Sequence, residues 1–164
     1  MAKEEFPITP AVRVLREKNI PFVPFVYRYE EHGGTKQFAQ EFSVPEHQVI
    51  KTLVFETDQK QPLLMLMHGD REVSTKQLAR LIGVKQVSPC DANTAMRNTG
   101  YQFGGTSPFG TRNALPVYVE KTILNQTKIY INGGKRGFII EIDPNDLKKV
   151  FPVIEVEAAI LPNS

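Results

Sequence analysis

The sequence is poor in the features that mark secreted, membrane-spanning or disulfide-stabilised proteins. Its 164 residues include one cysteine, Cys90, which excludes an internal disulfide and is typical of a reducing compartment. No apolar run approaches the ~18 residues needed to cross a bilayer. The first residues, MAKEEFPITP, lack the apolar stretch of a signal peptide. We therefore expect a cytoplasmic protein with no membrane segment.

Motifs of several enzyme classes are also missing. There is no G-x-S-x-G segment to support a serine hydrolase, and no glycine spacing matches a Walker loop or a Rossmann fingerprint. His32, His47 and His68 are far apart in sequence, and none has a metal-ligating residue one helical turn away. We therefore expect neither a metal nor a cofactor. Cys90 precedes a predicted helix, where a thiolate can be favoured, but a small buried side chain is the favoured interpretation.

The bulk composition predicts one globular domain spanning residues 1–164. Hydrophobic residues make up 41% and charged residues 23%, which is ordinary for a folded domain of this length. The net charge of +2 neither requires nor excludes an anionic partner. Local patterns of charge and glycine must therefore indicate the function.

Helical and strand patterns are mixed along the chain. Capping signals and apolar spacing predict helices at 10–19, about 35–42, 74–82, 92–98 and 143–150, with Thr9, Thr35 and Asp91 as N-caps and Gly83 as a left-handed stop. Alternation and β-branched runs predict strands at 49–56, 62–69, 84–88, 115–120, 127–132, 137–143 and 151–157, with residues 20–29 as an edge strand bent at Pro24. This order favours an α+β, or mixed α/β, domain built on one curved sheet or barrel.

Lys51 is unusual within its predicted strand. A two-residue period puts Val49, Lys51, Leu53 and Phe55 on one face of VIKTLVFE. An unpartnered ammonium buried there would cost several kcal/mol or lose its proton. Either Lys51 extends from a strand end into water, or its face lines a ligand site where the ammonium meets an anion or a carbonyl. The spacing alone favours the first alternative.

Two glycine-rich segments interrupt the second half of the chain. NTGYQFGGTSPFG, residues 98–110, permits positive φ and close approach of its backbone to a ligand, although its aromatic residues also suit an ordinary structured turn. INGGKRGFII, residues 131–140, can present backbone N–H groups and two cations to an anion. Taken by itself, the second segment is better explained as a Gly-Gly hairpin turn with exposed cations.

Three segments together resemble the YbaK/EbsC family of aminoacyl-tRNA deacylases, which includes the editing domain inserted in bacterial prolyl-tRNA synthetases. They are TPAVRVLREKNIPF, VIKTLVFE with its Lys51-Thr52 pair, and the combination of NTGYQFGGTSPFG with INGGKRGFIIEI. The resemblance covers about residues 9–156. It implies a single editing domain with a six- or seven-stranded, mixed, barrel-like sheet surrounded by helices. It also implies a site for the 3′-terminal adenosine of tRNA and its esterified amino acid.

The resemblance also implies which residues form this site. The catalytic candidates are Lys51, as the family's central lysine, and Thr52. The substrate-binding candidates are Tyr29, Gly104, Gly105, Asn132, Gly133, Gly134, Lys135 and Arg136. Asn132 stands where the cysteine-specific branch has serine, and Ile139 stands where it has aspartate. The segment between Tyr29 and Lys51 is also a few residues shorter. These departures make a preference for cysteine doubtful.

The implied function is trans-editing: cleavage of the ester of a mischarged tRNA, with Cys-tRNA(Pro) or a similar small amino acid as substrate. The attacking group is water or, in the cysteine branch, the substrate's own thiol. In this hypothesis Lys51 orients the aminoacyl or nucleotide group, backbone N–H groups near Gly104, Gly105 and Gly134 stabilise negative charge, and Lys135 and Arg136 lie nearer the phosphates.

Two alternatives remain open. One is a non-catalytic module that binds tRNA or nucleotide, with prolyl-tRNA synthetase as a candidate partner, and the other is a small-molecule phosphate-binding protein. The sequence does not specify the amino acid, the tRNA, the need for a synthetase, or whether the protein is a monomer or a weak dimer.

Overall fold

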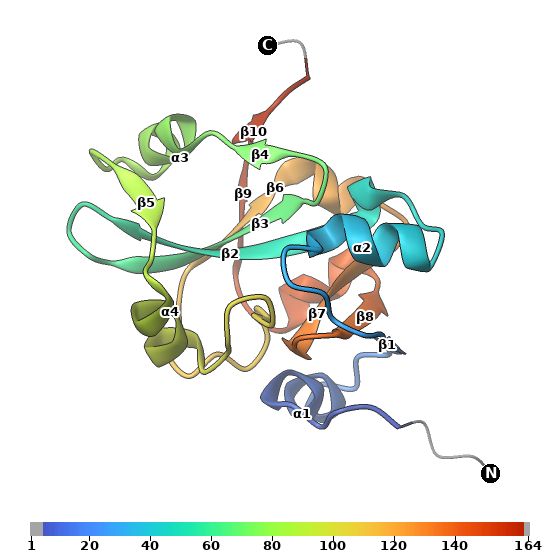
Figure 1. Ribbon diagram of the computed structural model, residues 1–164. Coiled ribbons are helices and arrows are strands. Elements are labelled where there is room, and N and C mark those ends of the chain that lie inside the picture. The colour runs from blue at the N-terminus through green and yellow to red at the C-terminus, as the bar shows by residue number, and fades with distance from the viewer. Residues whose placement is uncertain (1–4, 163–164) are drawn as a thin grey trace.

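A computed structural model describes residues 5–162 (Figure 1). Its α-helices are α1 (Pro10–Glu17), α2 (Gly34–Glu41), α3 (Thr75–Ile82) and α4 (Ala92–Thr99), with 3₁₀ segments η1 (Glu46–Gln48), η2 (Lys121–Asn125) and η3 (Pro144–Lys149). Its strands are β1 (Val23–Val26), β2 (Val49–Thr57), β3 (Pro62–His68), β4 (Glu72–Val73), β5 (Val87–Pro89), β6 (Val117–Glu120), β7 (Ile129–Lys135), β8 (Phe138–Ile142), β9 (Val153–Val156) and β10 (Ala159–Ile160). No helix between residues 5 and 162 has the length and apolarity to cross a membrane.

Most strands form one mixed sheet in the order β1-β8-β7-β2-β3-β6-β9, with β5 also paired to β2. The pairs β2/β7, β3/β6 and β6/β9 are parallel, and the other pairs in this sheet are antiparallel. The expected α+β domain with a mixed sheet flanked by helices is confirmed. The expected six or seven strands are too few, because the sheet has eight and a separate ribbon pairs β10 with β4.

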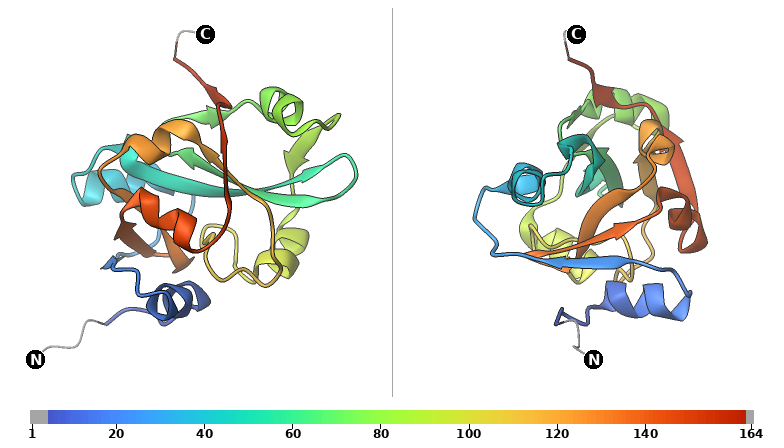
Figure 2. Two further views of the ribbon diagram at one scale, coloured as in Figure 1. Left: turned by 180° about the vertical axis from the view of Figure 1, so that it is seen from behind. Right: turned by 90° about the vertical axis from the view of Figure 1, so that its right-hand side faces the viewer.

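Alternation of side chains along the strands gives this sheet two packed faces. We call the inner face the one whose side chains, including Ile50, Leu66 and Ile131, join the largest core with α1. The outer face is covered at one end by α2, whose Phe38 packs with Val49. At the other end it is covered by α3, whose Leu78 lies in one cluster with Phe55, Met65 and Met67. Figures 1 and 2 show α1 below the β1/β8/β7 side of the sheet, well apart from α3.

Most local signals read from the sequence are confirmed. The side chains of Thr9 and Asp91 cap α1 and α4, and Gly83 ends α3 in the left-handed conformation. The predicted cap at Thr35 is wrong, because α2 starts after Gly33 and the Thr35 hydroxyl donates to Glu46 instead. The last predicted helix, at 143–150, is a 3₁₀ segment, η3, which follows its N-cap Asp143.

Candidate functional site

The sheet forks at the middle of β2. Strand β7 pairs with β2 only at Val49 and Ile50, opposite Tyr130 and Ile131. Strand β5 pairs with the same strand only from Phe55 to Thr57, and the Cys90 N–H extends this contact to the Val54 carbonyl. Residues 51–53 of β2 therefore lie between the part of β2 that pairs with β7 and the part that pairs with β5. Strand β7 is parallel to β2 and β5 is antiparallel to it, so the two strands that flank this fork run in opposite directions.

Lys51 emerges on the outer face at this fork. It follows Ile50 directly, and Asn132 follows Ile131 in the paired strand, so both side chains share the parity of Val49 and Tyr130 on the outer face. The Lys51 side chain is 22% exposed, and its Nζ lies 3.5 Å from Oε1 of Glu72, whose side chain is 83% exposed. An ion pair this long with so exposed a carboxylate contributes little stability. The ammonium can therefore exchange Glu72 for another anion or a carbonyl oxygen.

Asn132 organises the glycine segment that follows it. A register shift between Asn132 and Lys135 makes this part of β7 a bulge. Within the bulge, Asn132 Oδ1 accepts hydrogen bonds from the N–H groups of Gly134 at 2.7 Å and Lys135 at 3.2 Å. Bulges of this kind redirect side chains and are frequent beside binding sites. The expected Gly-Gly turn is therefore wrong in position: the reversal is at Arg136 and Gly137, and the glycine pair lies within the strand.

The second glycine segment is docked against this bulge. Asn132 Nδ2 donates to the Gly104 carbonyl at 3.1 Å, and Arg136 Nε donates to the Phe103 carbonyl at 2.7 Å. A Cβ on Gly105 would lie 2.8 Å from the Arg136 backbone nitrogen, so the two backbones approach as closely as glycine allows. The Thr9 hydroxyl, which caps α1, donates to the Gly133 carbonyl. Hydrogen bonds and close backbone contacts thus hold Thr9, residues 101–110 and residues 132–136 together. We call this assembly the glycine unit.

Tyr29 completes this unit from the N-terminal side. The Arg136 guanidinium lies 5.3 Å from the centroid of the Tyr29 ring, within the range of a cation–π contact. A Cβ on Gly104, which has φ +85°, would lie 2.6 Å from the Tyr29 hydroxyl. The left-handed φ of Gly104 and the nearby Tyr29 hydroxyl both favour glycine at this position.

The structure thus brings together the eight residues expected to bind substrate: Tyr29, Gly104, Gly105, Asn132, Gly133, Gly134, Lys135 and Arg136. Lys51 shares a sheet face with Asn132, one residue beyond the last paired residues. Thr52 points to the opposite, inner face, and its Oγ1 is buried with no hydrogen-bond partner among residues 5–162. The roles of all these residues in a reaction remain predictions.

The geometry changes one part of the expected chemistry. The Gly134 N–H donates to Asn132 Oδ1, and the Gly105 N–H donates to the Gln102 carbonyl at 2.8 Å. Neither group is free to stabilise an oxyanion, so the expectation that these two N–H groups do so is wrong for this conformation. The Lys51 ammonium is a weakly paired cationic donor on the outer face at the fork.

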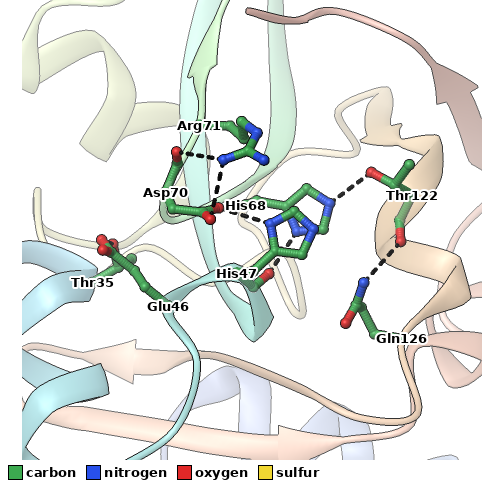
Figure 3. A network of polar contacts seen from close by, with 8 residues as sticks. All are labelled: Thr35, Glu46, His47, His68, Asp70, Arg71, Thr122 and Gln126. Carbon is green, nitrogen blue, oxygen red and sulfur yellow. Dashed lines mark hydrogen bonds and ion pairs between the residues drawn. The ribbon is translucent and has the colours of Figure 1, made fainter. Parts of the chain in front are cut away.

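A polar network that the sequence did not reveal lies at the start of β2 (Figure 3). The rings of His47 and His68 stack at 3.6 Å, His47 Nδ1 lies 2.9 Å from Asp70 Oδ1, and Arg71 also binds Asp70. His68 Nδ1 lies 2.6 Å from the His47 carbonyl and its Nε2 lies 2.7 Å from the Thr122 hydroxyl. Burial is the main cause that lowers the pKa of His68. The network depends on the β2/β3 register, which places Ile50 opposite His68 and which no local sequence pattern specifies.

Cys90 and the acidic residues add no further reactive cluster. Burial raises the pKa of the Cys90 thiol to about 11, which keeps it protonated at neutral pH. Among residues 5–162, no three His, Cys, Asp or Glu side chains are grouped as a metal site.

Comparison with known proteins identifies the family. The profile of the aminoacyl-tRNA editing domain matches residues 30–150, which include the fork, the glycine loop and the β7 bulge. The chain belongs to the aminoacyl-tRNA editing domain family. Within this family, an Enterococcus faecalis protein named as a proposed Cys-tRNA(Pro)/Cys-tRNA(Cys) deacylase, EbsC, is 28% identical over 137 residues, covering 83% of this chain and 84% of that protein.

Two further likenesses agree with this editing-domain assignment. A proline–tRNA ligase of Thermodesulfovibrio yellowstonii is 29% identical over 157 residues, which is 92% of this chain but 26% of the ligase. A solved structure described as a proposed trans-editing enzyme for prolyl tRNA synthetase has a TM-score of 0.80 at 20% identity, covering 94% of this chain and 100% of that one. At this identity the structural match supports the fold alone.

Proposed function

We propose that this editing domain is a trans-acting deacylase that cleaves the ester between a mischarged amino acid and the 3′ end of tRNA. The observation that carries the proposal is the position of Lys51: a weakly paired ammonium at the sheet fork, on the same face as Asn132 of the glycine unit. Family membership supports the reaction class. Since tRNA is charged and used in the cytoplasm, the proposal also includes that location.

The proposed step requires little machinery because an aminoacyl ester is already activated. A nucleophile adds to the carbonyl carbon, the carbonyl oxygen becomes an oxyanion, and the ester C–O bond breaks as the ribose oxygen takes up a proton. Lys51 would leave Glu72 and hold the oxyanion or an adjacent phosphate. One positioned donor of this kind contributes about 10²–10³-fold to a rate. Lys135 and Arg136 are exposed beside the bulge and would contact phosphates.

The nucleophile distinguishes a hydrolase from a lyase-type cleavage. Water yields the free amino acid, whereas the thiol of an esterified cysteine would form an S–C bond to its own carbonyl and leave as a cyclic thioester. Asn132 and Ile139, the two departures from the cysteine-specific pattern, are direct cross-strand partners. Ile139 is 6% exposed and packs in the cluster under α2. We therefore propose a small amino acid as the substrate and treat cysteine as one candidate among several.

A purely binding module is the second candidate, and one observation favours it. The N–H groups of Gly105 and Gly134, which were expected to stabilise the oxyanion, are already hydrogen-bonded. Such a module would shield the ester from water and slow its spontaneous loss.

The test is multiple-turnover deacylation of a panel of tRNA(Pro) charged with cysteine, alanine or proline. The proposal predicts accelerated release from at least one mischarged tRNA, with Pro-tRNA(Pro) as the unreactive control. Ester loss slower than the spontaneous rate for all three would support the binding module. Mass analysis of the product from the cysteine ester separates attack by water from attack by the thiol.

A further inference from the structure

Phe103 is the most exposed large hydrophobic side chain among the described residues, at 77%. It lies within the glycine loop, between Tyr101 and Gly105, which are both buried. An exposed aromatic ring at the tip of a floppy loop would need no explanation. The backbone that carries Phe103 is instead held in place on several sides.

Residues 102–105 form a tight turn with Phe103 at its first corner. The Gly105 N–H donates to the Gln102 carbonyl at 2.8 Å, and Gly104 at the second corner has φ +85°, as a type II turn requires. Both corner carbonyls are also held from the bulge: Phe103 O by Arg136 Nε at 2.7 Å and Gly104 O by Asn132 Nδ2 at 3.1 Å. The turn is therefore fixed to β7 while the Phe103 ring remains in solvent.

The surroundings of the ring favour an anionic polymer over an apolar partner. Arg136 and Lys135 are exposed, and Arg136 contacts both the Phe103 carbonyl and the Tyr29 ring. A flat aromatic ring beside cations on a rigid backbone is the combination that binds single-stranded nucleic acid: bases stack on the ring, and the cations follow the phosphates.

We propose that Phe103 is a stacking platform for an unpaired base of the single-stranded 3′ end of tRNA, and that it positions this end at the fork. This inference rests on the proposed function for the identity of the nucleic acid. Phe103 is a positioning residue and takes no part in the bond-breaking step. Its loss should therefore weaken binding and leave the chemical step intact.

Kinetics of four proteins test the role of the ring: wild type, Phe103→Ala, Phe103→Leu and Phe103→Trp. Loss of one base–aromatic stack predicts a rise in KM of roughly 5- to 150-fold for Phe103→Ala with kcat nearly unchanged. Phe103→Leu keeps an apolar side chain without a π face and should show a similar defect, whereas Phe103→Trp should retain the wild-type KM. An unchanged KM in Phe103→Ala, or full rescue by leucine, would overturn the inference.

Fluorescence provides a readout that does not depend on deacylation. The sequence contains no tryptophan, so Phe103→Trp introduces a single reporter. Leu81→Trp is the matched control, because Leu81 is 48% exposed on α3, which lies away from the glycine loop in Figure 1. Uncharged tRNA should quench Trp at position 103 and leave Trp at position 81 unchanged, and tRNA lacking its last three nucleotides should quench neither.

The two assays separate failure of the inference from failure of the proposed function. Deacylation by wild type with no quenching at position 103 would refute the stacking role alone. Quenching by intact tRNA without deacylation of any mischarged tRNA would refute the enzymatic proposal and support the platform. Quenching by prolyl-tRNA synthetase in the absence of RNA would show a protein-docking surface and overturn the inference.

Discussion

Replacing Gly105 with alanine should separate the glycine loop from the β7 bulge. The new Cβ would lie 2.8 Å from the Arg136 nitrogen and 3.0 Å from the Lys135 carbonyl carbon, whereas ordinary contacts begin at 3.4 Å. Both obstructing atoms are backbone atoms, so no side-chain rotation relieves the clash. The two segments must therefore part by about half an ångström, at an overpacking cost of about 1–3 kcal/mol.

This displacement should reduce deacylation much more than it reduces folding. Misplacement of reacting groups by about 1 Å can cost on the order of 10²-fold in rate, so a shift of half that size predicts about a tenfold loss. The assay is the initial rate of amino-acid release from mischarged tRNA, measured beside urea unfolding to confirm that the variant is folded under assay conditions.

Gly83→Ala is the matched control for this prediction. Gly83 ends α3 with φ +87°, and a Cβ there meets nothing within 4 Å, so the cost is backbone strain of about 1–2 kcal/mol. Similar losses of stability in both variants, with loss of activity only in Gly105→Ala, would support the site. Equal activities in the two variants would refute the reasoning.

Two further predictions concern buried polar groups. Thr52→Val removes a buried hydroxyl that has no hydrogen-bond partner among the described residues, so the free energy of unfolding should stay constant or rise by about 1 kcal/mol. If Thr52 is catalytic, the deacylation rate should fall at least about tenfold, as for loss of one catalytic group; an unchanged rate would remove it from the catalytic set. His68 has a pKa below its ordinary value of 6.5, so the unfolded chain binds more protons and the protein should lose stability as the pH falls below 6.5. His68→Asn should show a flatter dependence of urea midpoint on pH, although Asp70, Arg71 and His47 remain nearby; an equally steep dependence would contradict this assignment.

The sequence predicted local structure well where the signals were local. The alternation in residues 49–56 correctly placed Lys51 with Val49 and Phe55, because side-chain direction in a strand depends only on parity. The caps at Thr9 and Asp91 and the stop at Gly83 likewise depend on neighbouring residues. The same reasoning failed at Thr35. This residue lies inside α2, and its hydroxyl donates to Glu46, which lies outside that helix.

The site depended on contacts between distant segments, which periodicity cannot supply. Nothing local indicated that β7 leaves β2 after Ile50, or that Asn132 takes up the N–H groups of Gly134 and Lys135. The Gly-Gly pair suits both a turn and a bulge, and the pairing of β7 with β8 decides between them. The stack of His47 on His68 likewise follows from the β2/β3 register. The family resemblance, rather than the physical pattern, brought these residues together in advance.

Multiple-turnover deacylation by wild type and Lys51→Met, measured side by side, tests the central claim most directly. Methionine keeps an unbranched side chain of similar reach on the outer face and removes the ammonium. We predict that wild type releases the amino acid over many turnovers and that Lys51→Met is about 100-fold slower with an unchanged urea midpoint. Equal rates for the two proteins would contradict the claim that the ammonium at the fork carries the reaction.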